Sequence, residues 1–234
     1  MVLGKGDTTD APLPDGIALG PTRTRVTFTA GEPTAIESVS SGQDAVGTFT
    51  IIDVESKQDA IEWVKRLPRR NGDDEIEIRE GGCPGGVPAV SLSTAPRSAG
   101  DKRFVVMLKA DPHTETGRIA EEPRLRAMVK QNEASVKAGV MLAGEGLQPS
   151  SRGARVKFSG GKATIIDGPF AEAKELVAGF WLIRAKSKEE ALEWVKAYPF
   201  PFLDAEVEVR EALDVQVSSL KVQVSSVRRH ADPS

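Results

Sequence analysis

The second half of the chain carries two kinds of hydrophobic periodicity. Residues 103–110 are almost all apolar, as in a buried strand. In residues 122–139, apolar side chains recur every three or four positions, which predicts a helix that stops at Gly139. Residues 155–159 and 162–167 alternate in polarity on either side of two glycines, and this pattern predicts a β-hairpin.

A strand, a helix and a further strand are expected after this hairpin. Residues 176–185 are mostly apolar and predict a central strand. Ser187 is a good N-cap, and Glu190 completes a capping box for a helix that ends at Pro199. Residues 205–211 alternate between valine and charge, as a half-exposed strand does. The order strand, helix, hairpin, strand, helix, strand predicts an α+β unit whose antiparallel sheet carries helices on one face and is covered on the other by a second sheet.

The pattern of this unit also occurs earlier in the chain. Aligned without a gap, residues 46–80 and 177–211 are identical at 16 of 35 positions. Unrelated stretches of ordinary composition would share about two. The match includes two tryptophans, Trp63 and Trp194, which we expect at equivalent core positions of two helices. We therefore predict two tandem copies of one unit.

The first copy is predicted to be truncated at its N-terminus. Counterparts of the strand at 103–110 and the helix at 122–139 would have to precede residue 1, and only the polar stretch 1–13 is available. The expected organisation is a truncated, degenerate copy at 14–80, a flexible Gly/Pro/Ser-rich linker at 81–102, a complete copy at 103–214 and a tail at 215–234. Residues 215–227 repeat Val-Gln-Val-Ser-Ser, which suits either a strand added to the first copy or a disordered tail.

Several runs in the second copy match the pattern of a known family. Residues 141–147 read Met-Leu-Ala-Gly-Glu-Gly-Leu, residues 167–170 read Asp-Gly-Pro-Phe, and Gly-Phe-Trp follows at 179–181. These runs resemble the YCII-related (DGPF) domain family, and the resemblance covers all of the second copy. The first copy is similar only from residue 16 to residue 80, and Glu37-Ser38 stands in it where the second copy has Asp-Gly.

The resemblance implies a fold and a choice between two functions. The fold is ferredoxin-like and pairs into a dimeric α/β barrel, formed either by a homodimer or by the two copies of one chain. One function is a lyase, isomerase or dehalogenase-like activity on a small organic acid in the barrel cavity, because some members are thought to be enzymes with a His–Asp pair. The alternative is a ligand- or partner-binding module, linked to sigma-factor regulation.

Three residues are candidates for acid–base chemistry. Asp167 opens the Asp-Gly-Pro-Phe turn and is either a general base or substrate anchor at the barrel mouth, or the cap of a structural turn. Lys109 ends the first strand of its copy, where its cation is either a partner for Asp167 or an edge charge. His113 lies in the next loop, as an acid–base group or an exposed side chain. The following helix has no histidine where the family's enzymes would place one, and Asn132 is its most polar inward residue.

Five further residues are candidates for substrate binding, each with a structural alternative. Glu172 and Lys174 are otherwise solvated surface charges, and Arg155 has a counterpart in Arg25 that suggests pairing within the sheet. The remaining candidates are Phe170 of the turn and Trp181. Because Phe180 and Trp181 are neighbours on one strand, they face opposite sides of the sheet.

Composition narrows the partners and the cofactors. The net charge is −3 with no basic patch rich in aromatic residues, so we expect no direct contact with nucleic acid. No apolar run reaches the ~18–20 residues of a membrane span, and residues 1–20 lack a secretory h-region. Cys83 is the single cysteine, and neither a metal-ligand cluster nor a phosphate loop occurs, so no metal or cofactor is expected. The expected location is the cytoplasm.

Overall fold

The computed structural model describes residues 1–5, 13–40, 45–68, 74–93, 100–171 and 175–213. Its strands are β1 (Val2–Lys5), β2 (Ile17–Leu19), β3 (Thr22–Thr29), β4 (Glu32–Ser40), β5 (Val46–Thr50), β6 (Asp74–Ile78), β7 (Lys102–Lys109), β8 (Met141–Gly146), β9 (Ala154–Ser159), β10 (Lys162–Asp167), β11 (Val177–Ala185) and β12 (Ala205–Leu213). Its helices are α1 (Lys57–Lys65), α2 (Pro112–Glu115), α3 (Glu122–Lys137) and α4 (Lys188–Ala197), with a 3₁₀ turn η1 (Ser150–Arg152). None of these helices has the length and apolar character needed to cross a membrane.

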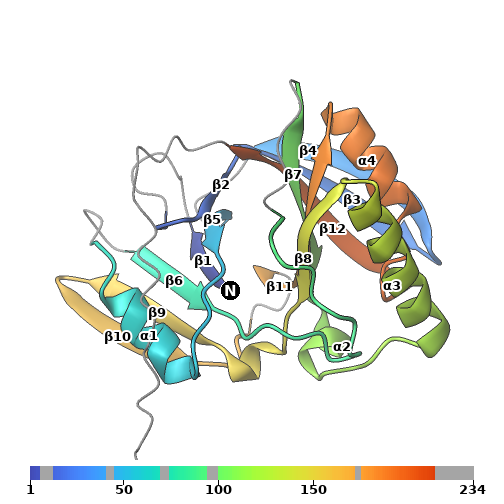
Figure 1. The fold of residues 1–234 in the computed structure, drawn as a ribbon. Helices are drawn as coiled ribbons and strands as arrows, with labels where there is room; N and C mark the ends of the chain where they lie inside the picture. The colour runs from blue at the N-terminus through green and yellow to red at the C-terminus, as the bar shows by residue number, and fades with distance from the viewer. Residues whose placement is uncertain (6–12, 41–44, 69–73, 94–99, 172–174, 214–234) are drawn as a thin grey trace, which may run out of the picture.

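All twelve described strands belong to one curled sheet, and every pairing is antiparallel. One half has the order β6-β1-β5-β2 and the other has the order β12-β7-β11-β8. The two halves join where β2 pairs with β12 and, at the far side, through a bridge between Gly81 and Leu147. Figure 1 shows the strands curling around a common centre, with α1 outside one half and α3 and α4 outside the other. This mixed architecture agrees with the predicted α+β class.

Each of the two hairpins pairs with a strand of the other half. The hairpin β3–β4 pairs with β12, and the hairpin β9–β10 pairs with β6. Both hairpins turn through residues with positive φ, which are Ala30 and Gly31 in one and Gly160 and Gly161 in the other. Two successive left-handed residues match the twist of the flanking strands, which is why the glycine pair predicted this hairpin.

The prediction that the first half lacks its first strand is wrong. β1 lies between β5 and β6, and Leu3 is paired with Phe49 on one side and with Glu77 on the other. Val2 and Leu3 are too short an apolar run to stand out in a polar stretch, yet both are buried. The described residues of the first half include no counterpart of the 16-residue α3. The segment 215–227, which we expected either to supply this strand or to be disordered, lies outside the described residues.

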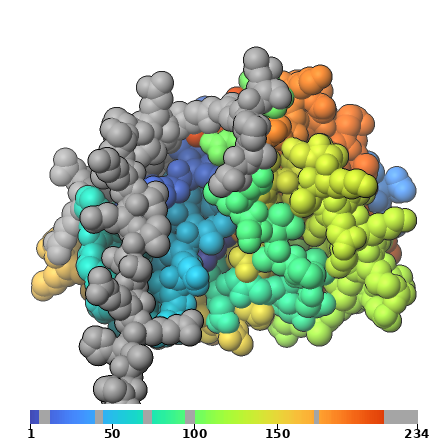
Figure 2. Space-filling view, viewed as in Figure 1, coloured from blue at the N-terminus to red at the C-terminus, as the bar shows by residue number. Residues whose placement is uncertain are grey.

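The segment from residue 81 to residue 93, which the composition predicted as part of a flexible linker, is fastened along β8. Backbone hydrogen bonds join Val90 and Gly144 in both directions, at 2.7 and 3.0 Å. The Ser93 N–H donates to the Leu142 carbonyl at 2.7 Å. Val87 and Val90 also pack against the core, which explains why a Gly/Pro-rich segment is held. In Figure 2 this segment, coloured teal to green, lies between the blue residues and the yellow-green residues of the visible face.

The sheet has an apolar outer face under the helices and an apolar inner face at the centre. Trp181 packs on the outer face with Met128 and Ala191. Phe180 packs on the inner face, where its ring centroid lies 5.5 Å from that of Phe49. The expectation that these neighbours face opposite sides is confirmed. The helix that covers Trp181 is capped as predicted, because the Ser187 Oγ accepts the Glu190 N–H at 3.2 Å.

Candidate functional site

The Asp-Gly-Pro-Phe turn packs against the η1 turn. A Cβ added at Gly168 would lie 1.9 Å from the Ser150 carbonyl oxygen, so no larger residue fits there. The Phe170 N–H donates to the Ser150 Oγ at 3.1 Å, and the Phe170 ring is buried. These contacts give the glycine and the phenylalanine of the motif a structural role.

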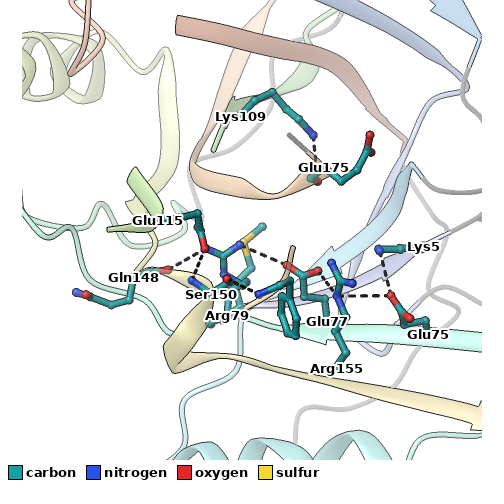
Figure 3. A network of polar contacts seen from close by, with 12 residues as sticks. Lys5, Glu75, Glu77, Arg79, Lys109, Glu115, Gln148, Ser150, Arg155 and Glu175 are labelled. Atoms are coloured by element: carbon teal, nitrogen blue, oxygen red, sulfur yellow. Dashed lines mark hydrogen bonds and ion pairs between the residues drawn. The ribbon is translucent and has the colours of Figure 1, made fainter. Parts of the chain in front are cut away.

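From Phe170 a closed ring of polar contacts runs through five other residues. The guanidinium of Arg155 lies over the Phe170 ring, with Cζ 4.0 Å from the centroid. Arg155 Nε donates to Glu77 at 3.0 Å, and Glu77 in turn pairs with Arg79 at 3.3 Å. Figure 3 shows Glu77 of β6, Glu115 of α2 and Ser150 of the η1 turn around Arg79, with Arg155 of β9 on the far side of Glu77. The complete ring is Phe170, Arg155, Glu77, Arg79, Glu115 and Ser150.

Burial decides what this ring does. Arg79 is 1% exposed and Glu77 is 3% exposed, so both charges are removed from water. Arg79 also donates to the Gln148 carbonyl at 2.8 Å, and Glu115 accepts the Ser150 N–H at 2.9 Å. A buried charge is tolerated only when its partners satisfy it in this way. The guanidinium of Arg155, a predicted substrate-binding residue, is therefore part of the fold's polar frame.

The three predicted acid–base residues have separate contacts. Asp167 accepts a hydrogen bond from the Lys57 ammonium at 2.7 Å, and its side chain is 67% exposed. Lys109 donates to the Glu175 carbonyl at 3.1 Å. His113 is exposed on α2. The cation that Asp167 contacts is therefore Lys57 of α1 in the other half, and not Lys109. Glu172 and Lys174 lie outside the described residues.

Trp181 lies beneath an apolar cavity of about 70 Å³ that α3 closes from outside. Its indole N–H donates to the Tyr198 hydroxyl at 2.9 Å, which donates to Asn132 at 2.7 Å. Burial raises the pKa of Tyr198, so this hydroxyl stays protonated. Asn132 therefore anchors a core hydrogen-bond chain at the edge of the cavity.

Glu145 on β8 is the residue that the sequence analysis missed. It lines the cavity next to Trp181 and two larger ones, of about 560 and 510 Å³. Within the described part of the chain its carboxylate accepts no hydrogen bond and forms no ion pair. Its charge does favour the protonated form of the Met1 amino group, whose pKa burial lowers. A charged residue inside an apolar strand was the available signal.

The segment 81–93 forms the lid of these cavities. Cys83 and Val87 line the small cavity with Glu145, and Val90 lines the 510 Å³ cavity with it. Gly81 lies so close that an added Cβ would be 2.4 Å from a Glu145 carboxylate oxygen. No group of three or more potential ligand side chains in the described ranges could hold a metal ion. The walls around Glu145 are mainly apolar in the small cavity and in the 510 Å³ cavity, which also has Asp15, whereas the 560 Å³ cavity carries charged residues that include Asp53 and Arg152.

Comparison with known proteins agrees with the motifs of the second half. The family profile of the YCII-related domain matches residues 103–214, which are 112 of the 234 residues. Residues 103–214 form a YCII-related domain. An uncharacterised protein of Rhizobium meliloti (strain 1021) is 39% identical over 61 residues, a match that covers 26% of this chain and 49% of that protein. The chain thus spans about half the length of this relative.

Proposed function

We propose that the chain is a YCII-type protein that binds a small, mainly apolar molecule through Glu145. The observation that carries the proposal is a half-buried carboxylate without a hydrogen-bond partner among the described residues, at the junction of three cavities. A buried carboxylate left without a partner costs free energy, so such a group is typical of a site that a ligand completes. Cavities of about 510 and 560 Å³ lie within the range that small molecules occupy in proteins.

The surroundings of Glu145 indicate the chemistry of the ligand. The small cavity that Glu145 shares with Cys83 has Leu125, Met128 and Trp181 in its walls, and the 510 Å³ cavity has Phe49, Phe180 and Leu182, so both suit an apolar body. A carboxylate only accepts hydrogen bonds when ionised, so the polar end of the ligand carries an amine or another N–H or O–H donor. A charge-assisted bond of this kind is stronger than a neutral one.

The contacts of the acid–base candidates favour binding over catalysis. General acid–base catalysis needs groups within hydrogen-bond reach of one substrate atom. Asp167 is held by Lys57 on the surface, and Lys109 is held by the Glu175 carbonyl. These contacts support the binding-module alternative, and a lyase, isomerase or dehalogenase-like reaction has no comparable support.

We further propose that the curled sheet is a pseudo-dimeric barrel of two ferredoxin-like copies within one chain. The orders β6-β1-β5-β2 and β12-β7-β11-β8 are equivalent: in each half, the last strand along the chain is followed in the sheet by the first, the third and the second. The Gly20 N–H donates to the Glu211 carbonyl at 2.7 Å, and the Gln148 N–H donates to the Glu80 carbonyl at 3.0 Å. These two bonds support equivalent seams at both junctions, because Glu80 and Glu211, which accept them, occupy the same position in the repeat.

Cys83 offers a direct test of the Glu145 site, because it lines the same small cavity and is the single cysteine. We would measure its alkylation by iodoacetamide with benzylamine, benzyl alcohol or benzoate present. Benzylamine should protect best, by roughly tenfold over the neutral alcohol if it forms one charge-assisted bond.

Two variants sharpen the test. Glu145→Gln keeps the shape and removes the charge, so the advantage of benzylamine should vanish. Glu193→Gln, on the exposed face of α4, is the matched control and should leave the advantage unchanged. Equal protection by all three compounds in the wild type, or an advantage that persists in Glu145→Gln, would contradict the proposal.

A further inference from the structure

Lys5 and Lys109 occupy matching places at the ends of β1 and β7. Leu3 pairs with Glu77 across β1 and β6, and Met107 pairs with Glu208 across β7 and β12. The two registers are therefore the same, and each lysine follows two positions later on its strand. The halves can be compared residue by residue at this point.

The two lysines have different partners. Lys5 forms an ion pair with Glu75 at 3.0 Å. The glutamate in the matching place beside Lys109 is Glu206, which pairs with Arg25 at 3.6 Å, as Glu75 does with Arg155, but forms no ion pair with Lys109. Lys109 is left with one hydrogen bond, to the Glu175 carbonyl at 3.1 Å, and no ion pair among the described residues. Lys109 is thus a partly buried cation that has no ion-pair partner in the described part of the chain.

A cavity of about 430 Å³ opens beside Lys109. Its walls come from the end of β7, from residues 27–29 of β3 and from the start of β12. Phe28 and Phe202 supply apolar surface, and Thr27 and Thr29 supply hydroxyl-bearing side chains. The space is large enough for a small organic molecule.

Three carboxylates also line this cavity, and each already has a partner. Asp111 accepts the Thr114 N–H at 2.7 Å, and Asp204 accepts the Ala30 N–H at 2.9 Å. Glu206 pairs with Arg25 at 3.6 Å. Lys109 is therefore the one cation among the described residues that line this wall, and no carboxylate there forms an ion pair with it.

We propose that Lys109 anchors the carboxylate of a small organic acid in this cavity, as a site separate from Glu145. The acid's carboxylate takes the place at Lys109 that Glu75 takes at Lys5, and its apolar part lies toward Phe28 and Phe202. The surrounding carboxylates limit the site to monocarboxylates, because a second negative charge would lie beside Glu206.

The test follows backbone amides by NMR while acetate, pyruvate or benzoate is added to the full chain. The expected result is saturable shifts at residues 27–29 and 108–111. Lys109→Met should weaken binding by roughly tenfold or more, because a charge-assisted hydrogen bond is lost. Glu206→Gln should strengthen binding, because a nearby negative charge is removed.

Lys5→Met is the matched control and should leave the affinity within roughly twofold of the wild type. Glu145→Gln should also leave this affinity unchanged, so the Lys109 site and the Glu145 site are tested independently. The proposal is overturned if Lys109→Met keeps the wild-type affinity while its amide spectrum remains that of the folded protein. It is equally overturned if none of the three acids shifts the amides at 27–29 and 108–111.

Discussion

The guanidinium of Arg155 stacks on the ring of Phe170, with Cζ 4.0 Å from the ring centroid. The two residues come from a strand and from the turn that follows its hairpin, and each is also tied to a third partner. Arg155 holds Glu77 on β6, and the Phe170 N–H holds Ser150. The stack therefore couples the turn of one half of the chain to a strand of the other half.

Removing the Phe170 ring should destabilise the protein substantially. Phe170→Ala empties a buried site and removes the cation–π contact, for an expected loss of about 3–5 kcal/mol in the free energy of unfolding. Urea denaturation measures this loss. Phe202→Ala is the matched control, since Arg118 lies farther from that ring, at 5.8 Å, and the Phe202 side chain is only partly buried. A Phe170→Ala protein as stable as the control would show that the turn is not part of the structural frame.

Charge removal should destabilise the protein more at the buried pair of Glu77 and Arg79 than at the exposed pair of Asp167 and Lys57. Glu77→Gln removes one of the two carboxylates paired with the buried Arg79 and also the charge that holds Arg155, and we expect a loss of about 3–5 kcal/mol in unfolding free energy. Asp167→Asn breaks the exposed pair with Lys57, where we expect about 0–1 kcal/mol. Equilibrium unfolding of both variants gives the comparison. A loss of ligand binding or activity in a folded Asp167→Asn protein would return Asp167 to the candidate site.

The affinity for benzoate should fall with rising pH earlier than an ordinary lysine would allow. Burial lowers the pKa of Lys109, and the nearby acids Glu208, Glu175 and Glu206 only partly oppose it. The free site therefore loses its positive charge below the ordinary lysine value of about 10.4. Titrations of benzoate between about pH 7 and pH 10 would measure the decline. Affinity that stays constant up to the ordinary lysine range would mean that this ammonium does not hold the ligand.

The lowered pKa of Lys109 should also make the free energy of unfolding rise with pH, whereas the affinity for benzoate falls. A lysine whose pKa is lowered by folding carries a cost while it is charged in the folded state. Unfolding stability then rises between the folded pKa and about 10.4, because only the unfolded chain still binds the proton there. Lys109→Met should lack this rise. Thermal or urea unfolding across that interval, compared between wild type and variant, measures the difference.

Local elements were predictable, and contacts between distant segments were not. The hairpin at Gly160-Gly161 and the helix capped by Ser187 follow from a few neighbouring residues. By contrast, Glu145 gains its importance from the segment 81–93, which lies across its strand through backbone hydrogen bonds that side-chain identity does not reveal. The difference between Lys5 and Lys109 is similar, because both matching glutamates pair with an arginine and only Lys5 also reaches its glutamate.

The strand β1, which was not predicted, shows what a sequence repeat cannot reveal. Sequence identity located the aligned part of the first half well, but β1 shares its place in the sheet rather than its sequence with β7. Val2 and Leu3 become recognisable only when their neighbours β5 and β6 are known.

Because each hairpin pairs with a strand of the other half, the order of synthesis on the ribosome limits the order in which the sheet can form. β6 has completed its own half by residue 78, yet its outer neighbour β9 begins only at residue 154. The hairpin β3–β4 must stay unpaired for longer, because it pairs with β12: Arg23 of β3 and its partner Glu208 of β12 are 185 residues apart in the chain. Contacts of such separation fold slowly and leave strand edges open meanwhile. The nascent first half is therefore the stage at which this protein most needs protection from aggregation.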